Sequence, residues 1–127
     1  MTTEETRQFI GRYIEAMTGG DSRSPEVVAK YIDDEALIEH IAMFDQAFPG
    51  YSMEVHDTLV DGDKAILRAT FHGVHKGPFQ GVAPTNREVS TPLLIVYRIE
   101  NGKIVEHWMQ ADILSLMRQL DAMPTPA

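Results

Sequence analysis

Asp112 is the residue of this sequence whose type and position best suit proton transfer. It follows an apolar segment that carries Trp108, and it precedes residues 113–120, whose apolar positions fit one face of a helix. A carboxyl group at the end of such a strand could lie at the floor of an apolar pocket, where loss of solvation raises its pKa toward the range of acid–base catalysis. Alternatively, Asp112 caps the following helix, because its side-chain oxygen can accept a backbone N–H. The sequence leaves both interpretations open.

Two histidines could assist this carboxyl group. His107 belongs to the same segment as Asp112, but strict alternation along a strand places the two on opposite faces. His107 therefore reaches the same pocket only if a bulge or the strand end intervenes, and otherwise faces a partner subunit or solvent. His75 shares the parity of Phe71, which favours the pocket side, although it opens a loop where solvated histidines are common. His40 lies on the polar flank of a helix, so we expect it to be exposed.

Aromatic and methionine side chains could make such a pocket dry. They come from the first and third helical segments, the strands and the long loop, and they are Tyr13, Met17, Phe44, Phe48, Phe71, Phe79 and Trp108. Aromatic surroundings disfavour a carboxylate anion, and the neutral acid can then donate a hydrogen bond to a carbonyl group. Trp108 could equally be an ordinary core residue, since large aromatic side chains dominate cores.

The elements that must position these residues follow from periodicity. Helical spacing and capping signals predict three N-terminal helices, twofold alternation then predicts a meander of antiparallel strands, and a short helix closes the chain. The expected helices cover residues 2–17, 25–32, 34–48 and 113–120, and the expected strands cover 53–59, 67–75, 87–100 and 104–112. We expect a single α+β domain over residues 1–127, with the helices gathered on one side of a strongly bent sheet.

Composition excludes several classes of function. The net charge is −8 with no basic run, so nucleic acid is not an expected partner, and the chain has no cysteine for a thiol nucleophile or a thiolate metal site. The five histidines lack the pairings typical of a metal site, so we expect none. No run of eighteen apolar residues and no signal sequence is present, which predicts a cytoplasmic protein that does not enter membranes. The segment 93–97 is apolar on both parities, which predicts a homodimer formed through the sheet.

Two motifs give the chain a family resemblance. Residues 71–89 read FHGVHKGPFQGVAPTNREV, and residues 98–108 with Asp112 follow at a matching distance. This pattern resembles the SnoaL-like polyketide cyclases, also called ester cyclases, of the nuclear transport factor 2-like superfamily, which also contains the ketosteroid isomerases. The resemblance covers residues 53–120. It implies a cone-shaped pocket without a cofactor, in which Asp112 is the acid–base group of an intramolecular aldol ring closure, with His107 and His75 at the family's histidine positions.

The resemblance therefore predicts a cyclase- or isomerase-type enzyme that acts on a small apolar carbonyl compound by proton transfer. Ketosteroid isomerase-like activity and epoxide hydrolysis are alternatives on the same fold, and a third is a domain that only binds a small ligand or associates with itself. The chain departs from longer members of the family, which place an extra strand and loop between the second and third helices. Here residues 32–35 pass directly into the third helix.

Overall fold

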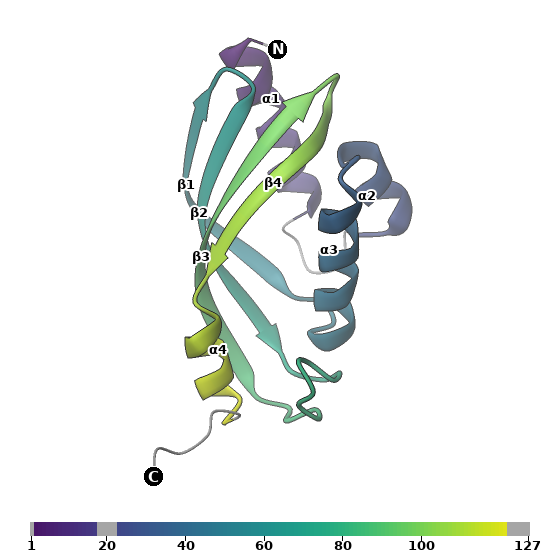
Figure 1. Ribbon diagram of the computed structural model, residues 1–127, viewed down its shortest axis with the longest axis vertical. Helices are drawn as coiled ribbons and strands as arrows, with labels where there is room; N and C mark the ends of the chain where they lie inside the picture. The colour runs from purple at the N-terminus through teal and green to yellow at the C-terminus, as the bar shows by residue number, and fades with distance from the viewer. Residues whose placement is uncertain (1, 18–22, 122–127) are drawn as a thin grey trace.

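The computed structural model describes residues 2–17 and 23–121. The helices are α1 (Thr3–Met17), α2 (Pro25–Tyr31), α3 (Glu35–Ala47) and α4 (Ile113–Gln119), and the strands are β1 (Ser52–Asp61), β2 (Lys64–Val74), β3 (Glu88–Glu100) and β4 (Lys103–Ala111). The strands form one antiparallel sheet in the order β1-β2-β3-β4. The helices α1, α2 and α3 lie on one side of this sheet, and α4 continues from the end of β4 (Figure 1). The predicted α+β arrangement is confirmed.

The N-terminal helices begin at the residues whose side chains can cap them. The Thr2 hydroxyl accepts the Glu5 amide, while Glu5 accepts the Thr2 amide, which is the reciprocal capping box. Ser24 caps α2 at the Val27 amide, with proline in the first turn. Asp34 caps α3 in the same way. These local signals fix where each helix enters the layer above the sheet.

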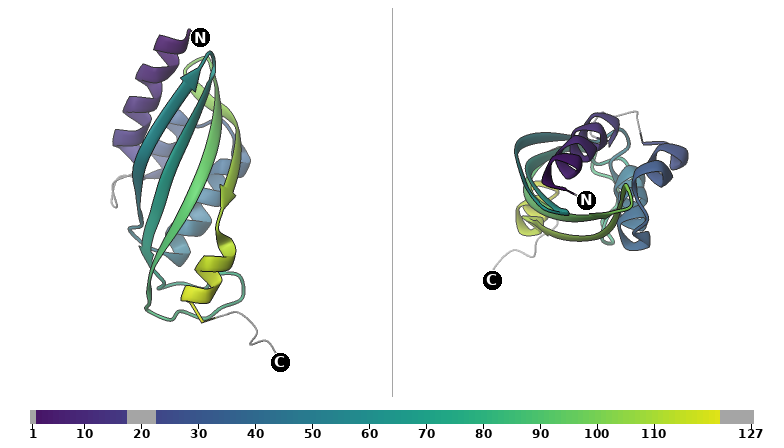
Figure 2. Two further views of the ribbon diagram at one scale, coloured as in Figure 1. Left: turned by 90° about the vertical axis from the view of Figure 1, so that its left-hand side faces the viewer. Right: turned by 90° about the horizontal axis from the view of Figure 1, so that it is seen from above.

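The sheet curls strongly around the helices. Seen from above, its strands form an arc that partly encloses α1, with α3 across the open side (Figure 2). Register shifts interrupt the ladders between Val55 and Asp57 and between Arg98 and Ile99, where a bulge bends a strand and increases its twist. The curvature leaves a space between the concave face of the sheet and α3.

The concave face of the sheet carries the core, and the convex face is open. In β3, Leu93, Ile95 and Tyr97 are buried against the helices, while Leu94 between them is 49% exposed. Within one chain the helices cover only one face of this strand, so the homodimer expected through the other face stays a prediction. The apolar residues of the other parity remain available to a second molecule.

The ends of the sheet are held by α4 and by the loop that follows β2. The Gln119 side chain accepts the Ser90 amide and donates to the Ser90 carbonyl, so α4 is fixed against the start of β3. In the loop, the amides of Lys76 and Gly77 both donate to the Ala47 carbonyl at the end of α3. Backbone hydrogen bonds thus join the loop to the end of α3. Within the described ranges, no helix is long and apolar enough to span a bilayer.

The close approach of the loop to α3 requires glycine at position 77. A Cβ built there would lie against the backbone carbonyl oxygen of Gln46, which cannot move without disrupting the helix end. We expect Gly77→Ala to lower the free energy of unfolding by about 1–3 kcal/mol, the usual cost of overpacking. Gly11 on α1 is the matched control, because nothing lies within 4 Å of its Cβ position. Gly11→Ala should raise stability by about 0.5–1 kcal/mol. Equal effects of the two substitutions in urea denaturation would contradict this account.

Candidate functional site

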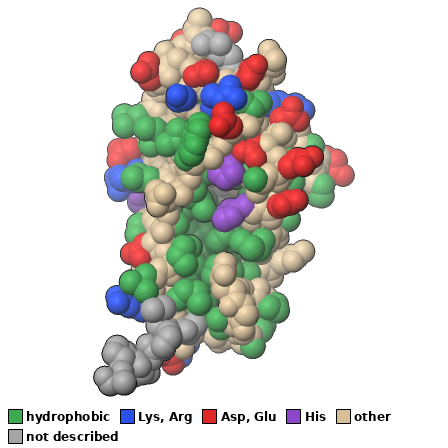
Figure 3. Space-filling model, in the orientation of Figure 1, with side chains coloured by type: hydrophobic (Ala, Val, Ile, Leu, Met, Phe, Trp, Pro, Cys, Tyr) green, Lys and Arg blue, Asp and Glu red, His purple; other side chains and the backbone are tan. Residues whose placement is uncertain are grey.

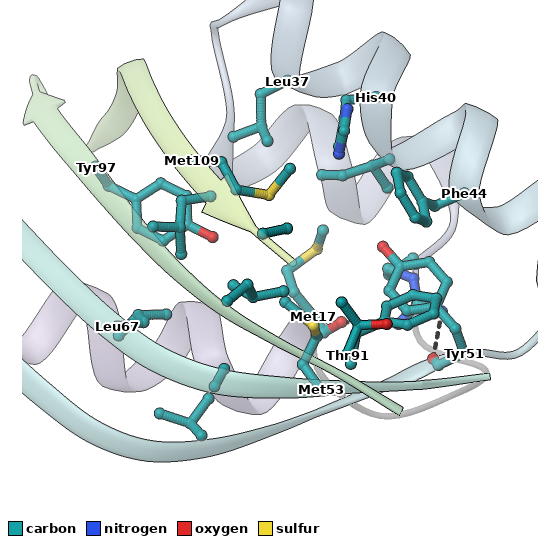
Figure 4. Close-up of a pocket in the computed structure, with 18 of the residues that line it drawn as sticks. Met17, Leu37, His40, Phe44, Tyr51, Met53, Leu67, Thr91, Tyr97 and Met109 are labelled. Carbon is teal, nitrogen blue, oxygen red and sulfur yellow. Dashed lines mark hydrogen bonds between the residues drawn. The ribbon is translucent and has the colours of Figure 1, made fainter. Parts of the chain in front are cut away.

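An apolar cavity lies between the helices and the concave face of the sheet. It contains about 820 Å³ of empty space, counting the part open to solvent. Most of its lining is aliphatic, aromatic or methionine side chains (Figure 4). The lining residues with polar side chains are Tyr13, Arg23, His40, Tyr51, Thr91 and Tyr97. No Asp or Glu of the described chain lines it, so among the described residues an acid–base group in direct contact with a ligand comes from this set.

His40 is the lining residue that titrates closest to neutral pH. It projects from α3 toward the cavity (Figure 4), half-buried, with its ring packed 4.7 Å from that of Phe44. Burial lowers the pKa of His40, and the positive charge of nearby His107 lowers it further. The imidazole is therefore neutral at pH 7 and can accept a proton. In the described chain, its ring nitrogens make no hydrogen bond to another residue.

His107 lies close to His40 but is engaged by a carboxylate. Its Nδ1 lies 2.7 Å from Oδ2 of Asp34, and both side chains are largely buried. The other carboxylate oxygen of Asp34 accepts the amide of Leu37 at the start of α3. Burial alone would raise the pKa of Asp34, but the bonds from His107 and Leu37 outweigh it, and the pKa is lowered. This hydrogen-bonded pair connects the start of α3 to β4, where histidine side chains flank a hollow in the surface (Figure 3).

Three buried tyrosines place hydroxyl groups around the cavity. The hydroxyl oxygens of Tyr13 and Tyr97 lie 3.3 Å apart and share a hydrogen bond. Burial raises the pKa of Tyr13 to about 12, and it raises those of Tyr97 and Tyr51 further. All three phenols therefore keep their protons at any physiological pH. Tyr13 donates its proton to Tyr97, so Tyr97 and Tyr51 are the two that can donate a hydrogen bond to an oxygen of a bound molecule.

Arg23 is a buried cation at one wall of the cavity. Its guanidinium group stacks on the Tyr51 ring at 3.6 Å, donates to the Tyr51 carbonyl oxygen, and forms an ion pair with Asp45 at 2.9 Å. It also donates to the carbonyl oxygen of Met17. Because these groups hold the charge from several sides, Arg23 joins α1, α3 and the residue that precedes β1, and we assign it to the framework of the site.

The structure does not place Asp112 in the cavity. Its side chain is exposed, and Oδ1 accepts the amide of Ser115 at 3.0 Å, which makes it the N-cap of α4. Its chain neighbours Ala111 and Ile113 line the cavity, but Asp112 points the other way. The predicted burial of this carboxyl group is therefore corrected, because the parity that faces the helices is that of Met109 and Ala111.

The same parity decides the positions of His107 and Trp108. His107 shares the parity of Met109, so it lies on the helix side of β4 without any bulge between it and Asp112. Trp108 is 49% exposed on the convex face, opposite Val96 of β3. Trp108 is thus neither core nor pocket wall. The expected pocket position of Trp108 is corrected for the same reason as that of Asp112.

His75 is buried beneath the loop and holds it in place. Its Nδ1 accepts the amide of Thr85 and lies 3.0 Å from the Thr85 hydroxyl, while its backbone bonds to Asn86 and Arg87. Its ring packs 5.5 Å from that of Phe48. His75 does not line the cavity, because these contacts keep its ring within the closed end of the fold.

The expected aromatic lining divides into two groups. Tyr13, Met17, Phe44 and Phe71 line the cavity. Phe48 and Phe79 instead pack against Phe44 in a buried cluster behind it, with ring centroids 5.3–5.9 Å apart. They support the wall without contributing surface to it.

Sequence reasoning missed His40 and Thr91. His40 was expected to be exposed, yet it lines the cavity, and the signal was its spacing of three from Leu37 and four from Phe44, both on the buried face of α3. Thr91 shares the parity of Leu93 and is 2% exposed.

Across the described ranges, the structure contains no group of three or more acidic or histidine side chains arranged to hold a metal ion.

Comparisons with known proteins give the same family that the motifs indicate. The model of the family described as SnoaL-like polyketide cyclase matches residues 16–120. TsrD from Streptomyces laurentii is similar in structure, with a TM-score of 0.80 and 26% identity over 97% of this chain and 99% of that one. So is IdmH from Streptomyces antibioticus, provisionally named a polyketide cyclase, with a TM-score of 0.73 and 25% identity over 92% and 99%.

A third structure confirms the nuclear transport factor 2-like fold alone. It comes from Jannaschia sp. CCS1, is provisionally named a SnoaL-like polyketide cyclase, and has a TM-score of 0.83 and 21% identity over 97% of this chain and 96% of that one. No protein with a curated function matches the chain in sequence.

The position of Asp112 gives a direct test of its role as a cap. Asp112→Ala should lower the free energy of unfolding by about 1 kcal/mol, because the Ser115 amide loses its acceptor. Asp112→Asn should cost only a few tenths, since asparagine caps equally well. Chemical denaturation of the three proteins measures both effects. A gain in stability in either variant, as expected on removing a desolvated carboxylate, would contradict the exposed cap.

Proposed function

Because the chain belongs to the SnoaL-like polyketide cyclase family, we propose that it is a cofactor-independent enzyme of cyclase or isomerase type that acts on a small apolar carbonyl compound in the cavity. The apolar lining favours a hydrophobic molecule, and the phenols offer donors for its oxygen. The observation that carries the proposal is the neutral imidazole of His40 at the cavity wall, because it supplies a base where no carboxylate of the described chain does.

In this proposal His40 is the catalytic base. A neutral ring nitrogen takes the proton from the carbon next to a carbonyl group, and the electron pair moves to the carbonyl oxygen to form an enolate. A tyrosine hydroxyl stabilises that oxygen by donating a hydrogen bond, as Tyr51 and Tyr97 both keep their protons. The enolate carbon then either attacks a second carbonyl of the same molecule or recovers a proton at another carbon. Protonated His40 returns the proton to the new alkoxide or carbon, so the cycle closes without a cofactor.

The Asp34–His107 pair acts on His40 through its charge. The 2.7 Å contact holds the His107 ring beside His40, and a proton on one imidazole disfavours a proton on the other. His40 therefore gives up its acquired proton more readily than an isolated histidine would. The pair is a positioning and tuning element in this proposal, and it does not itself reach the reacting atoms.

One observation favours a second function, which is binding without chemistry. The described lining holds a single histidine and no carboxylate, so a cavity that only carries an apolar ligand is consistent with the same geometry. Epoxide hydrolysis has less support, because it needs carboxylates near the ligand and those of the described chain lie elsewhere. A His40 variant that loses proton transfer but still binds the ligand would support catalysis over ligand binding alone.

We also propose that the protein forms a homodimer through the convex face of the sheet. An apolar row crosses the four strands there, since Leu59 pairs with Ile66, Ile66 with Val96, and Val96 with Trp108. Leu94 lies beside this row, and several of these side chains are substantially exposed. A contiguous exposed apolar surface of this kind is typical of a protein–protein contact.

Replacing His40 tests the catalytic proposal. Deuterium exchange at the α-carbon of 2-tetralone, an apolar ketone, measures proton removal without knowledge of the natural substrate. His40→Gln should reduce the catalysed exchange rate by about 10²–10⁴-fold, the usual contribution of a general base, while 2-tetralone still binds. His56→Gln is the control, because the His56 side chain is exposed and, within the described residues, hydrogen-bonds Thr70 alone. The wild-type rate should be constant near pH 7 and fall below pH 6.5 with a midpoint under that value, because the pKa of His40 is lowered. Exchange that survives in His40→Gln would overturn the assignment.

The dimer is tested with two leucines of nearly equal exposure. Leu94→Glu places a charge on the proposed interface and should convert the dimer to a monomer at micromolar concentration in sedimentation equilibrium. Leu114 on α4 is 48% exposed, against 49% for Leu94, so Leu114→Glu is a matched control that should remain dimeric. A wild-type protein that is monomeric under these conditions, or a control that dissociates equally, would refute the sheet interface.

A further inference from the structure

We propose that Thr91 is a specificity-determining residue that hydrogen-bonds a second oxygen of the substrate, so that the natural ligand carries two oxygen functions on an apolar framework. One oxygen belongs to the carbonyl group activated near His40, and the other reaches the sheet wall. The inference rests on the proposed function for the first oxygen only. It names the class of compound that this cavity selects among apolar carbonyl compounds.

The Thr91 hydroxyl is a buried polar group without a partner. The residue is 2% exposed, its Oγ1 makes no hydrogen bond to the described chain, and it lines the cavity. The other buried side-chain atom in this condition, Nε2 of His75, does not line the cavity. A buried hydroxyl that lacks a partner destabilises a protein, and valine would fill the same space in a β-strand without that penalty. The fold therefore gives no reason for threonine at this position.

The hydroxyl of Thr91 lies among apolar side chains on the sheet wall of the cavity. Phe71 is its direct partner across the β2–β3 ladder, and Leu93 lies next on the same face of β3. Figure 4 shows Thr91 rising from the sheet toward the cavity, with His40 on the opposite, helical side. A ligand that spans the cavity thus meets a base at one wall and a hydroxyl at the other. Because this hydroxyl would be left unpaired by an analogue that lacks the second oxygen, the site discriminates against such an analogue.

Thr6 shows what a structural threonine looks like in the same protein. It is also buried, but its hydroxyl donates to the Gly62 carbonyl oxygen at 2.6 Å, which ties α1 to the β1–β2 turn. The two residues have the same chemistry and similar burial, and they differ in whether the protein itself satisfies the hydroxyl. This contrast provides a matched pair of substitutions.

The test compares Thr91→Val and Thr6→Val in stability and ligand preference. Calorimetry measures the affinity of each protein for 2-tetralone and for hydroxy-2-tetralones that add a second oxygen on the ring opposite the ketone. We expect wild type and Thr6→Val to bind the best hydroxylated ketone about tenfold more tightly than 2-tetralone, the effect of one net hydrogen bond. Thr91→Val should lose this preference while remaining at least as stable as wild type, whereas Thr6→Val should be less stable.

The outcomes separate this inference from the proposed function. A preference that persists in Thr91→Val, or is absent in wild type, would overturn the role of Thr91 even if His40-dependent exchange is observed. Loss of stability in Thr91→Val with an unchanged preference would likewise assign the residue to the fold. A preference that depends on Thr91 supports the inference even if no exchange occurs, in which case the enzyme proposal fails and the cavity is a binding site.

Discussion

The contact between Asp34 and His107 is the interaction on which the site depends. One carboxylate oxygen begins α3 by accepting the Leu37 amide, and the other binds His107 on β4, so a single side chain joins the helical layer to the last strand. The adjacent backbone reinforces the link, since the Asp33 amide donates to the Ile104 carbonyl oxygen at 2.8 Å. Together these bonds fix the separation of α3 from β4, and hence the mouth of the cavity. They also commit one histidine to a carboxylate, which leaves the other free to accept a proton.

The interior of the cavity combines an apolar surface with very few polar groups, and this combination sets its chemistry. Arg23 is neutralised by Asp45 and shared among backbone carbonyl oxygens, and Tyr13 and Tyr97 bond each other. Electrostatic interactions are stronger in an apolar environment than in water. The few polar groups that still have an unused hydrogen-bond donor or acceptor can therefore bind a ligand more strongly here than they would in water. His40 and Thr91 are among those groups, and they belong to opposite walls.

Much of the fold could be predicted from the sequence, whereas the site could not. Capping residues such as Ser24 and Asp34 and the alternation in β2 act locally, so a pattern within a few residues is enough to place each element. Which face of β4 packs against the helices depends instead on tertiary packing. The large side chain of Trp108 favoured one parity, but the smaller Met109 and Ala111 of the other parity line the cavity. Because Asp112 was assigned by the same parity, the error in one strand face moved the predicted catalytic carboxylate out of the pocket.

The charges at the mouth also couple the chemistry to the stability of the fold. The pKa of His40 is lower in the folded protein than the ordinary value of 6.5, so the unfolded chain binds the proton first, and the stabilising contribution is complete above pH 6.5 and declines as the pH falls below it. The pKa of Asp34 is lowered from 3.8, so its contribution is present above that value and is lost at more acidic pH. The two effects have the same sign, so the contribution of these two groups to the stability of the fold is greatest in the pH range where His40 is neutral. An acid–base site built around a lowered histidine pKa thus works under the conditions that hold α3 against β4, and acidification weakens the base and its support together.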